Sequence, residues 1–175
     1  GRVGGVATLL RTLAPLLDLG VPTVEGPTLA EIAAAAPPAD GRVIHPLERP
    51  LASDGGLAVL RGNLAPAGAV VKVSGVEPAM HRHRGPAVVC EGEEAVRERL
   101  LGGAVRPGDV LVVRYEGPRG GPGMREMSLP AALLVGMGLG SSVAIITDGR
   151  YSGATRGPCI GHVAPEAALG GPLAL

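Results

Sequence analysis

Two spacings of hydrophobic residues alternate along the chain of 175 residues. In residues 6–19 Leu recurs at helical spacing, which predicts a helix with a broad apolar face. A second helix is expected over residues 29–36, because Thr28 precedes it and Glu31 follows three positions later, the spacing of a capping box. Together these segments predict a helical N-terminal preface over residues 1–39.

From residue 40 the pattern changes to short runs of Val and Ile bounded by Gly, Pro or Asp, which is typical of buried strands. Such runs lie at residues 68–73, 86–91, 109–116 and 142–148, and helices are expected at residues 93–103 and 128–139. Residues 40–175 are therefore expected to form a β-rich α/β domain with flanking helices. A barrel and a layered sheet both fit this order, and the many Gly and Pro turns favour the barrel.

Charge and composition narrow the function classes. The 16 basic and 16 acidic residues balance, so nothing indicates binding to nucleic acid or to an anionic membrane. No apolar run approaches the ~18 residues that cross a bilayer, and no signal peptide is visible, so a cytoplasmic protein is expected. Cys90 and Cys159 form no CxxC pair, which favours two free thiols over a disulfide.

Residues 117–127, "GPRGGPGMREM", are too rich in Gly and Pro for a regular helix or strand. Their backbone N–H groups are suited to an anion-binding nest. Glu126, at the exit of this loop, is a candidate ligand for a hard cation such as Mg²⁺. The alternative is that its carboxylate only stabilises the start of the following helix.

A second loop, "TDGRYSGATRGPCIGHVAPEA", covers residues 147–167. Ser152 follows a predicted strand, a position where α/β proteins bind ligands, although a serine among glycines is also an ordinary turn residue. Arg150 and Tyr151 precede it, so this is not the G-x-S-x-G nucleophile elbow. Arg150 and Arg156 are suited to holding a carboxylate, or are solvated surface residues.

Other candidates in and near these loops have weaker signals. His162 is either a base or, more in keeping with its Ile and Val neighbours, a core histidine bonded to backbone. Cys159 lies in the predicted loop, and Asp148 has the place of a turn residue. His81 and His83 alternate but have no third metal ligand in view. In the sequence, the single lysine, Lys72, lies far from any Gly-rich loop, which excludes a Walker lysine.

Taken together, residues 55–72, 113–127 and 146–175 closely resemble the dihydroxy-acid dehydratase and phosphogluconate dehydratase family, with "GGPGMREM" and "DGRYSGATRG" as the most specific motifs. Members are much longer than this chain, and both ends of the chain look cut. The resemblance implies the C-terminal, barrel-like swivelling (β/β/α) domain over residues 40–175. The missing N-terminal domain would carry an iron–sulfur cluster and most ligands of a Mg²⁺ ion.

The resemblance also implies the chemistry. "TRGPCIGHVAPEA" is more similar to the branched-chain amino-acid enzyme, a hydro-lyase that converts 2,3-dihydroxy acids to 2-keto acids. It places Glu126 on the Mg²⁺ ion and makes Ser152 the base. We add that the backbone N–H groups of Gly153 and Thr155, with Arg156, bind the substrate carboxylate.

By itself the chain is expected to be inactive and to self-associate, as a homodimer or another homo-oligomer, through the apolar wall that its missing domain would cover. Two other readings stay open. One is a sugar-acid dehydratase domain of the phosphogluconate type, and the other is a non-catalytic anion-binding or assembly module.

Overall fold

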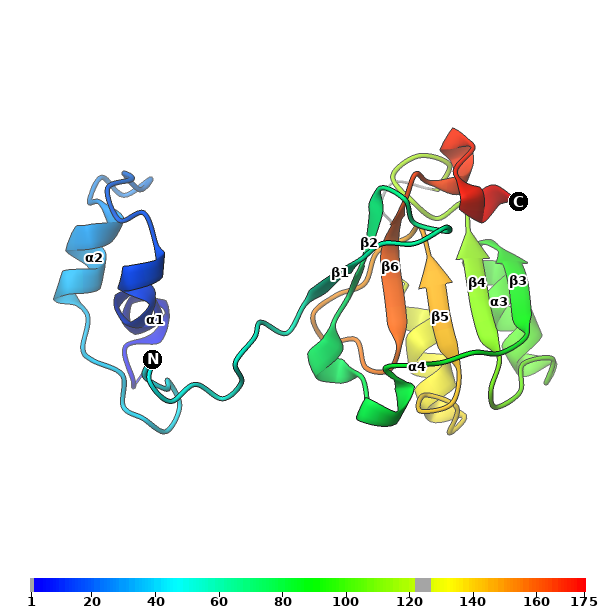
Figure 1. The fold of residues 1–175 in the computed structure, drawn as a ribbon, viewed down its shortest axis with the longest axis horizontal. Helices are drawn as coiled ribbons and strands as arrows, with labels where there is room; N and C mark the ends of the chain where they lie inside the picture. The colour runs from blue at the N-terminus through cyan, green and yellow to red at the C-terminus, as the bar shows by residue number, and fades with distance from the viewer. Residues whose placement is uncertain (1, 122–126) are drawn as a thin grey trace. The chain divides into compact units, whose positions relative to one another are not determined.

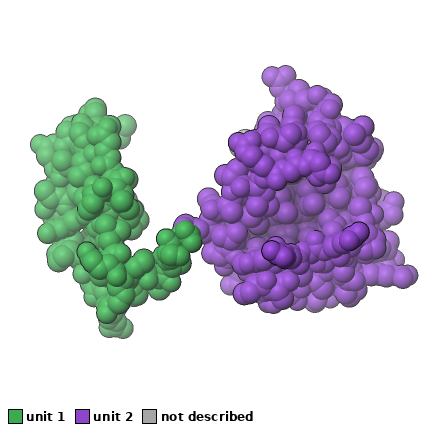
Figure 2. All heavy atoms as spheres, viewed as in Figure 1, with its two compact units in different colours: residues 1–54 green, residues 55–175 purple. Residues whose placement is uncertain are grey.

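A computed structural model describes residues 2–121 and 127–175. The chain divides into two compact units, Gly1–Asp54 and Gly55–Leu175 (Figure 2). The division therefore falls later than the expected boundary after residue 39, because the segment of residues 40–54 belongs with the helical unit. Within the described residues, every helix is too short or too polar to cross a membrane.

The first unit contains α1 (Gly5–Leu13), the 3-10 turn η1 (Ala14–Leu16) and α2 (Leu29–Ala35). The capping box is confirmed: Thr28 Oγ1 accepts from Glu31 N at 3.3 Å, and Glu31 Oε2 accepts from Thr28 N at 2.7 Å. This exchange satisfies two N–H groups that the helix itself leaves unpaired. Fully buried Thr8 donates to the carbonyl of Pro37 at 3.0 Å, which joins α1 to the segment after α2.

The second unit is built on one six-stranded mixed sheet with the strand order β1-β2-β6-β5-β4-β3 (Figure 1). The strands are β1 (Ala58–Leu60), β2 (Gly68–Val71), β3 (Ala87–Glu91), β4 (Val110–Arg114), β5 (Ala144–Thr147) and β6 (Cys159–Ala164). The four from β3 to β6 run parallel, whereas β2 is antiparallel to both β6 and β1. The α/β class is confirmed, and the arrangement is the layered sheet rather than the closed barrel that the turns favoured.

Alternation along the strands divides the apolar residues between two faces of the sheet. On one face, α3 (Gly92–Leu101) and α4 (Ser128–Gly136) pack against the strands (Figure 1). This core includes Val96, Leu100, Leu111, Val113, Leu134 and Ile145. On the other face, Val112 and Val163 pack with Ala69, Ala167 and Leu173, so loops and the C-terminal 3-10 turns cover it. Among the described residues, the helix-covered core is filled by aliphatic side chains, apart from partly buried Tyr151 and the sulfur residues.

Candidate functional site

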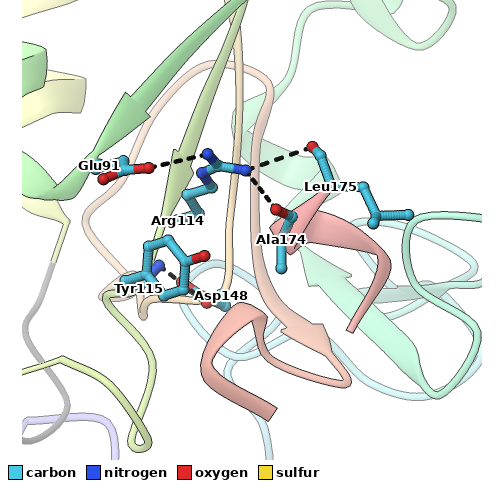
Figure 3. A network of polar contacts seen from close by, with 6 residues as sticks. All are labelled: Glu91, Arg114, Tyr115, Asp148, Ala174 and Leu175. Atoms are coloured by element: carbon cyan, nitrogen blue, oxygen red, sulfur yellow. Dashed lines mark hydrogen bonds and ion pairs between the residues drawn. The ribbon is translucent and has the colours of Figure 1, made fainter. Parts of the chain in front are cut away.

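Asp148 joins, through hydrogen bonds, the segments that follow the carboxyl ends of the central strands. It follows β5, is fully buried, and accepts hydrogen bonds from the backbone N–H groups of Tyr115 (3.2 Å), Glu116 (2.9 Å) and Ala167 (3.0 Å). Figure 3 shows the contact with Tyr115, whose φ of 67° turns the chain sharply after β4. Asp148 is thus a structural anchor that joins the segments after β4, β5 and β6, and the sequence pattern indicated only a turn residue.

Arg114, the last residue of β4, fixes the C-terminal segment at the same edge (Figure 3). Its guanidinium group donates to the carbonyl of Ala174 at 2.7 Å and forms an ion pair with Glu91 at 2.9 Å. The guanidinium carbon also lies 5.5 Å from the centre of the Tyr115 ring. These contacts occupy Arg114 structurally, so we do not assign it to a ligand.

The connection from β5 to β6, residues 148–158, carries the predicted site residues other than Glu126. Because β5 and β6 are parallel neighbours, it leaves the carboxyl end of β5 and returns to the start of β6. Met127, just before α4, donates its N–H to the carbonyl of Arg150 at 2.7 Å. The N–H of Gly157 donates to the carbonyl of Gly75 at 2.8 Å. The two Gly-rich loops of the sequence are therefore joined directly, through the described end of the first.

Lys72 is a residue of this site that sequence reasoning missed. Its ammonium group donates to the carbonyl of Gly153, the residue after Ser152, across 81 positions of sequence. Our expectation that Lys72 lies far from any Gly-rich loop is wrong in space, because β2 pairs with β6 and ends beside its start. The one sequence signal available was that the chain has a single lysine.

His162 reaches the site through a bulge in β6. Between the pairs Gly68–Ala164 and Val70–Gly161, β6 contains one residue more than β2. His162 lies in this bulge with a φ of 58°, and its N–H donates to the carbonyl of Gly149 at 2.9 Å. Bulges of this kind redirect side chains and are common beside active sites. The core-histidine interpretation is wrong, because His162 is exposed.

Cys159 is also placed differently from the expectation. It is the first residue of β6, a strand that the sequence pattern did not predict, and it is buried. Both cysteines are free, as predicted.

Two cavities meet at Ser152. One, of about 440 Å³, lies between α4 and the loop, and the other, of about 300 Å³, lies beside β2 and β6. The first is lined by Ser128, Ala131, Ala132, Val135, Gly136, Ser152, Ala154, Thr155 and Arg156, and the second by Leu57, Val70, Lys72, Tyr151, Ser152, Gly153, Thr155, Gly157, Cys159 and His162. Within the described residues, the lining includes two basic side chains, Lys72 and Arg156, and no carboxylate. This charge pattern is suited to an anionic ligand.

The hydrogen-bond donors that the loop around Thr155 offers to an anionic ligand differ from the backbone N–H groups that were expected. The N–H of Thr155 already donates to the carbonyl of Ser152 at 3.2 Å. Thr155 is only 9% exposed, and its buried hydroxyl has no hydrogen-bond partner in the described part of the chain. Arg156 is exposed on the larger cavity, whereas Arg150 donates to the carbonyl of Asp148 at 2.7 Å, so the two arginines do not act as one fork. The Thr155 hydroxyl and Arg156 are therefore the available donors.

Burial sets the protonation of the groups around the smaller cavity. It raises the pKa of the Cys159 thiol to about 12, against a smaller opposing effect of the Tyr151 hydroxyl, and it raises the pKa of Tyr151 well above its usual range. Partial desolvation, and then the positive charge of Arg150, lowers the pKa of His162, although the residue is largely exposed. At neutral pH the thiol and phenol therefore stay protonated, while the imidazole is neutral and able to accept a proton.

The predicted metal ligand, Glu126, lies outside the described residues. Ser128, two positions later in the sequence, lines the same cavity as Ser152. Among residues 2–121 and 127–175, no group of three His, Cys, Asp or Glu side chains is placed to hold a metal ion. His83 Nε2 lies 3.0 Å from the carbonyl of Gly108, and His81 lines a different cavity. These residues, with two buried thiols on separate strands, do not fit an iron–sulfur cluster.

Comparison with known proteins agrees with these motifs. Residues 42–175 match the family model described as "Dihydroxy-acid/6-phosphogluconate dehydratase C-terminal". The chain is 54% identical over 176 residues to a dihydroxy-acid dehydratase of Aquifex aeolicus, covering 99% of this chain and 32% of that protein. It is 57% identical over 172 residues to the protein of that name from Geobacter sulfurreducens, covering 98% of this chain and 31% of the relative.

The chain thus spans about a third of the length of the curated relatives that it matches. The matched region includes the whole second unit, with its sheet, the Ser152 loop and both cavities. The chain belongs to the dihydroxy-acid/6-phosphogluconate dehydratase family and corresponds to the C-terminal domain of its members.

Proposed function

We propose that this chain is the C-terminal part of a dihydroxy-acid dehydratase, a hydro-lyase that removes water from 2,3-dihydroxy acids to give 2-keto acids in branched-chain amino-acid biosynthesis. The observation that carries the proposal is the pair of cavities that meet at Ser152, with basic and hydroxyl groups on their walls and no carboxylate among the described residues. The names of the relatives support the substrate class.

The residues of this chain have distinct tasks in the proposed reaction. Arg156 and the Thr155 hydroxyl bind the substrate carboxylate, because a charged donor and a buried hydroxyl without a partner among the described residues both favour an anionic oxygen. Gly153 has no side chain and is exposed at the rim, which allows the ligand to approach the backbone closely.

Neutral His162, on the same cavity as Ser152, takes the hydroxyl proton of the serine, and Ser152 then accepts the proton from the carbon next to the carboxylate. The electrons of that C–H bond form the C2–C3 double bond, and the C3 hydroxyl leaves as water with the proton that His162 took up. The resulting enol gains a proton at C3, loses its O–H proton and becomes the keto acid.

The remaining parts of the proposed enzyme lie beyond these residues. We propose that a preceding N-terminal domain supplies the iron–sulfur cluster and most Mg²⁺ ligands, that Glu126 completes the Mg²⁺ site, and that the enzyme is a cytoplasmic homodimer. The relatives support an additional domain by their length. Because the described residues fit neither metal group, we assign no step of the chemistry to them. Metal analysis and light scattering on the complete enzyme test these assignments.

The experiment that tests the function is a Ser152→Ala substitution in the complete enzyme, with turnover of a 2,3-dihydroxy acid measured as keto-acid formation. We expect kcat to fall by about 10³-fold or more with the fold intact, since the alanine has no group to accept the proton. The matched control is Ser53→Ala, at an exposed serine in the first unit that bonds only to Asp54 at 3.0 Å among the described residues.

The outcome separates the alternatives. A Ser152→Ala enzyme with turnover within about 10-fold of the parent would remove the proposed base and favour the non-catalytic module. Faster turnover of a phosphorylated sugar acid than of a 2,3-dihydroxy acid would favour the phosphogluconate type. The 175-residue chain assayed alone is expected to form no keto acid.

A further inference from the structure

Among residues 2–121 and 127–175, Lys72 is the one basic residue that forms a hydrogen bond with the backbone of Gly153, next to Ser152. We infer that Lys72 is a positioning residue for Ser152: its ammonium group holds the carbonyl of Gly153 and so fixes the serine at the junction of the two cavities. The inference rests on the proposed function for the role of Ser152, but not for the contact itself.

The topology explains why this lysine reaches the loop. Lys72 follows β2, and the β2–β6 pairing places Val71 opposite Ile160, one residue into β6. The end of β2 therefore lies where the connection from β5 returns to the sheet. The same segment meets the loop again through the carbonyl of Gly75, which accepts the N–H of Gly157 at 2.8 Å. The backbone here is so close that a Cβ atom at Gly75 would lie 3.0 Å from the carbonyl oxygen of Thr155.

Near Ser152, the loop has few other attachments. The stretch from Ser152 to Thr155 contains no helix or strand, and its internal hydrogen bond, from Thr155 N to Ser152 O, is 3.2 Å long. Among the described residues, Lys72 donates the one hydrogen bond that reaches this stretch from outside it. The nearest backbone anchors are Arg150 on one side and Gly157 on the other. Removing the lysine would therefore release the stretch over several residues.

The chemistry of the contact makes it a specific anchor. A hydrogen bond from a charged donor is about twice as strong as a neutral one, and a neutral side chain of similar length cannot replace it. Gly153 has no Cβ, so without the lysine its peptide group can rotate at little steric cost. Rotation of that peptide changes the direction of the Ser152 side chain, and a misplacement of about 1 Å at a reacting group can lower turnover about 10²-fold.

The first test is kinetic and uses the complete enzyme with Lys72→Met, Lys72→Arg and a control, Arg82→Met, at an exposed arginine that lines neither cavity. Lys72→Met is expected to lower kcat by about 10- to 100-fold and to change KM less than about 3-fold, because the stretch from Ser152 to Thr155 moves while Arg156, outside that stretch, still binds the substrate carboxylate. Lys72→Arg is expected to recover kcat to within about 5-fold, since its guanidinium group also donates a charge-assisted hydrogen bond.

The second test is independent of activity and uses the 175-residue chain. Hydrogen exchange at the Thr155 amide is expected to become at least about 10-fold faster in Lys72→Met, whereas the Val112 amide in β4 keeps its rate. Unchanged exchange at Thr155 would overturn the inference, as would kcat of Lys72→Met within about 2-fold of the parent. An effect on KM alone, or equal losses in the Met and Arg variants, would overturn it too. A Ser152→Ala enzyme that keeps turnover would instead refute the proposed function. The hydrogen-exchange result would still show whether Lys72 holds the loop at Gly153.

Discussion

Replacing Asp148 by Asn is expected to lower the free energy of unfolding of the second unit by about 3 kcal/mol. The carboxylate accepts three backbone N–H groups, one at Oδ1 and two at Oδ2, and is fully buried. Hydrogen bonds to a charged group contribute roughly 1.5–3 kcal/mol each, about twice as much as neutral ones. An Asn side chain keeps one acceptor oxygen, so at least one N–H group faces an NH₂ group instead, and the remaining bonds become neutral.

Urea denaturation followed by tyrosine fluorescence measures this effect in the correct unit. Tyr115 and Tyr151 are the only aromatic residues of the chain, and both lie in residues 55–175, so the signal reports on that unit alone. With a slope of roughly 1–3 kcal/mol per M of urea, the loss moves the midpoint down by about 1–3 M. The matched control is Asp109→Asn, because Asp109 accepts one backbone N–H, from Arg106 at 2.8 Å.

The comparison between the two substitutions decides the argument. Asp109→Asn is expected to cost about 1 kcal/mol, in line with one bond instead of three. If Asp148→Asn costs no more than this control, then Asp148 does not join the three segments energetically, and it is only the turn residue that its sequence position indicated.

Three further predictions concern other parts of the second unit. Arg114→Met should leave the sheet folded but speed hydrogen exchange at the amides of residues 174 and 175 by about 10-fold, because the guanidinium contacts to the carbonyls of Ala174 and Leu175 are lost. Exchange as slow as in the parent would contradict this prediction. At pH 8 the Cys159 thiol of the folded protein should react with a thiol reagent about 10³-fold more slowly than the same thiol in urea, since its pKa of about 12 lies three units above the ordinary value of 9.0. Rapid labelling of Cys159 in the folded protein would show that the thiol is not buried. The folded-state pKa of His162 lies below 6.5, so the unfolded chain binds more protons between the two pKa values, and stability is lost as pH falls through that window. The substitution His162→Gln should therefore make the urea midpoint depend less on pH between pH 8 and 5. An unchanged dependence would refute the pKa assignment.

Local sequence patterns were sufficient where the deciding interactions are local. The capping box of α2 depends on Thr28 and Glu31, three positions apart, and both partners are found as predicted. Each of the four predicted runs contains a strand in the structure, because continuous runs of Val and Ile favour strands that are buried on both faces of a sheet. In contrast, β6 was missed, since "CIGHVA" contains a glycine and a histidine and lies inside a loop-like composition.

The sequence by itself determined the capping box of α2, the four strand runs, the free thiols and the family motifs around Ser152. Only the tertiary structure decided that Asp148 accepts three backbone N–H groups while fully buried, that a bulge places His162 on a cavity lined by Ser152, and that Lys72 reaches Gly153. Glu126, which lies outside the described residues, stays a prediction. The physical reason for this division is that a pattern of neighbours fixes backbone preference and burial, whereas a contact across 81 residues depends on which strands pair.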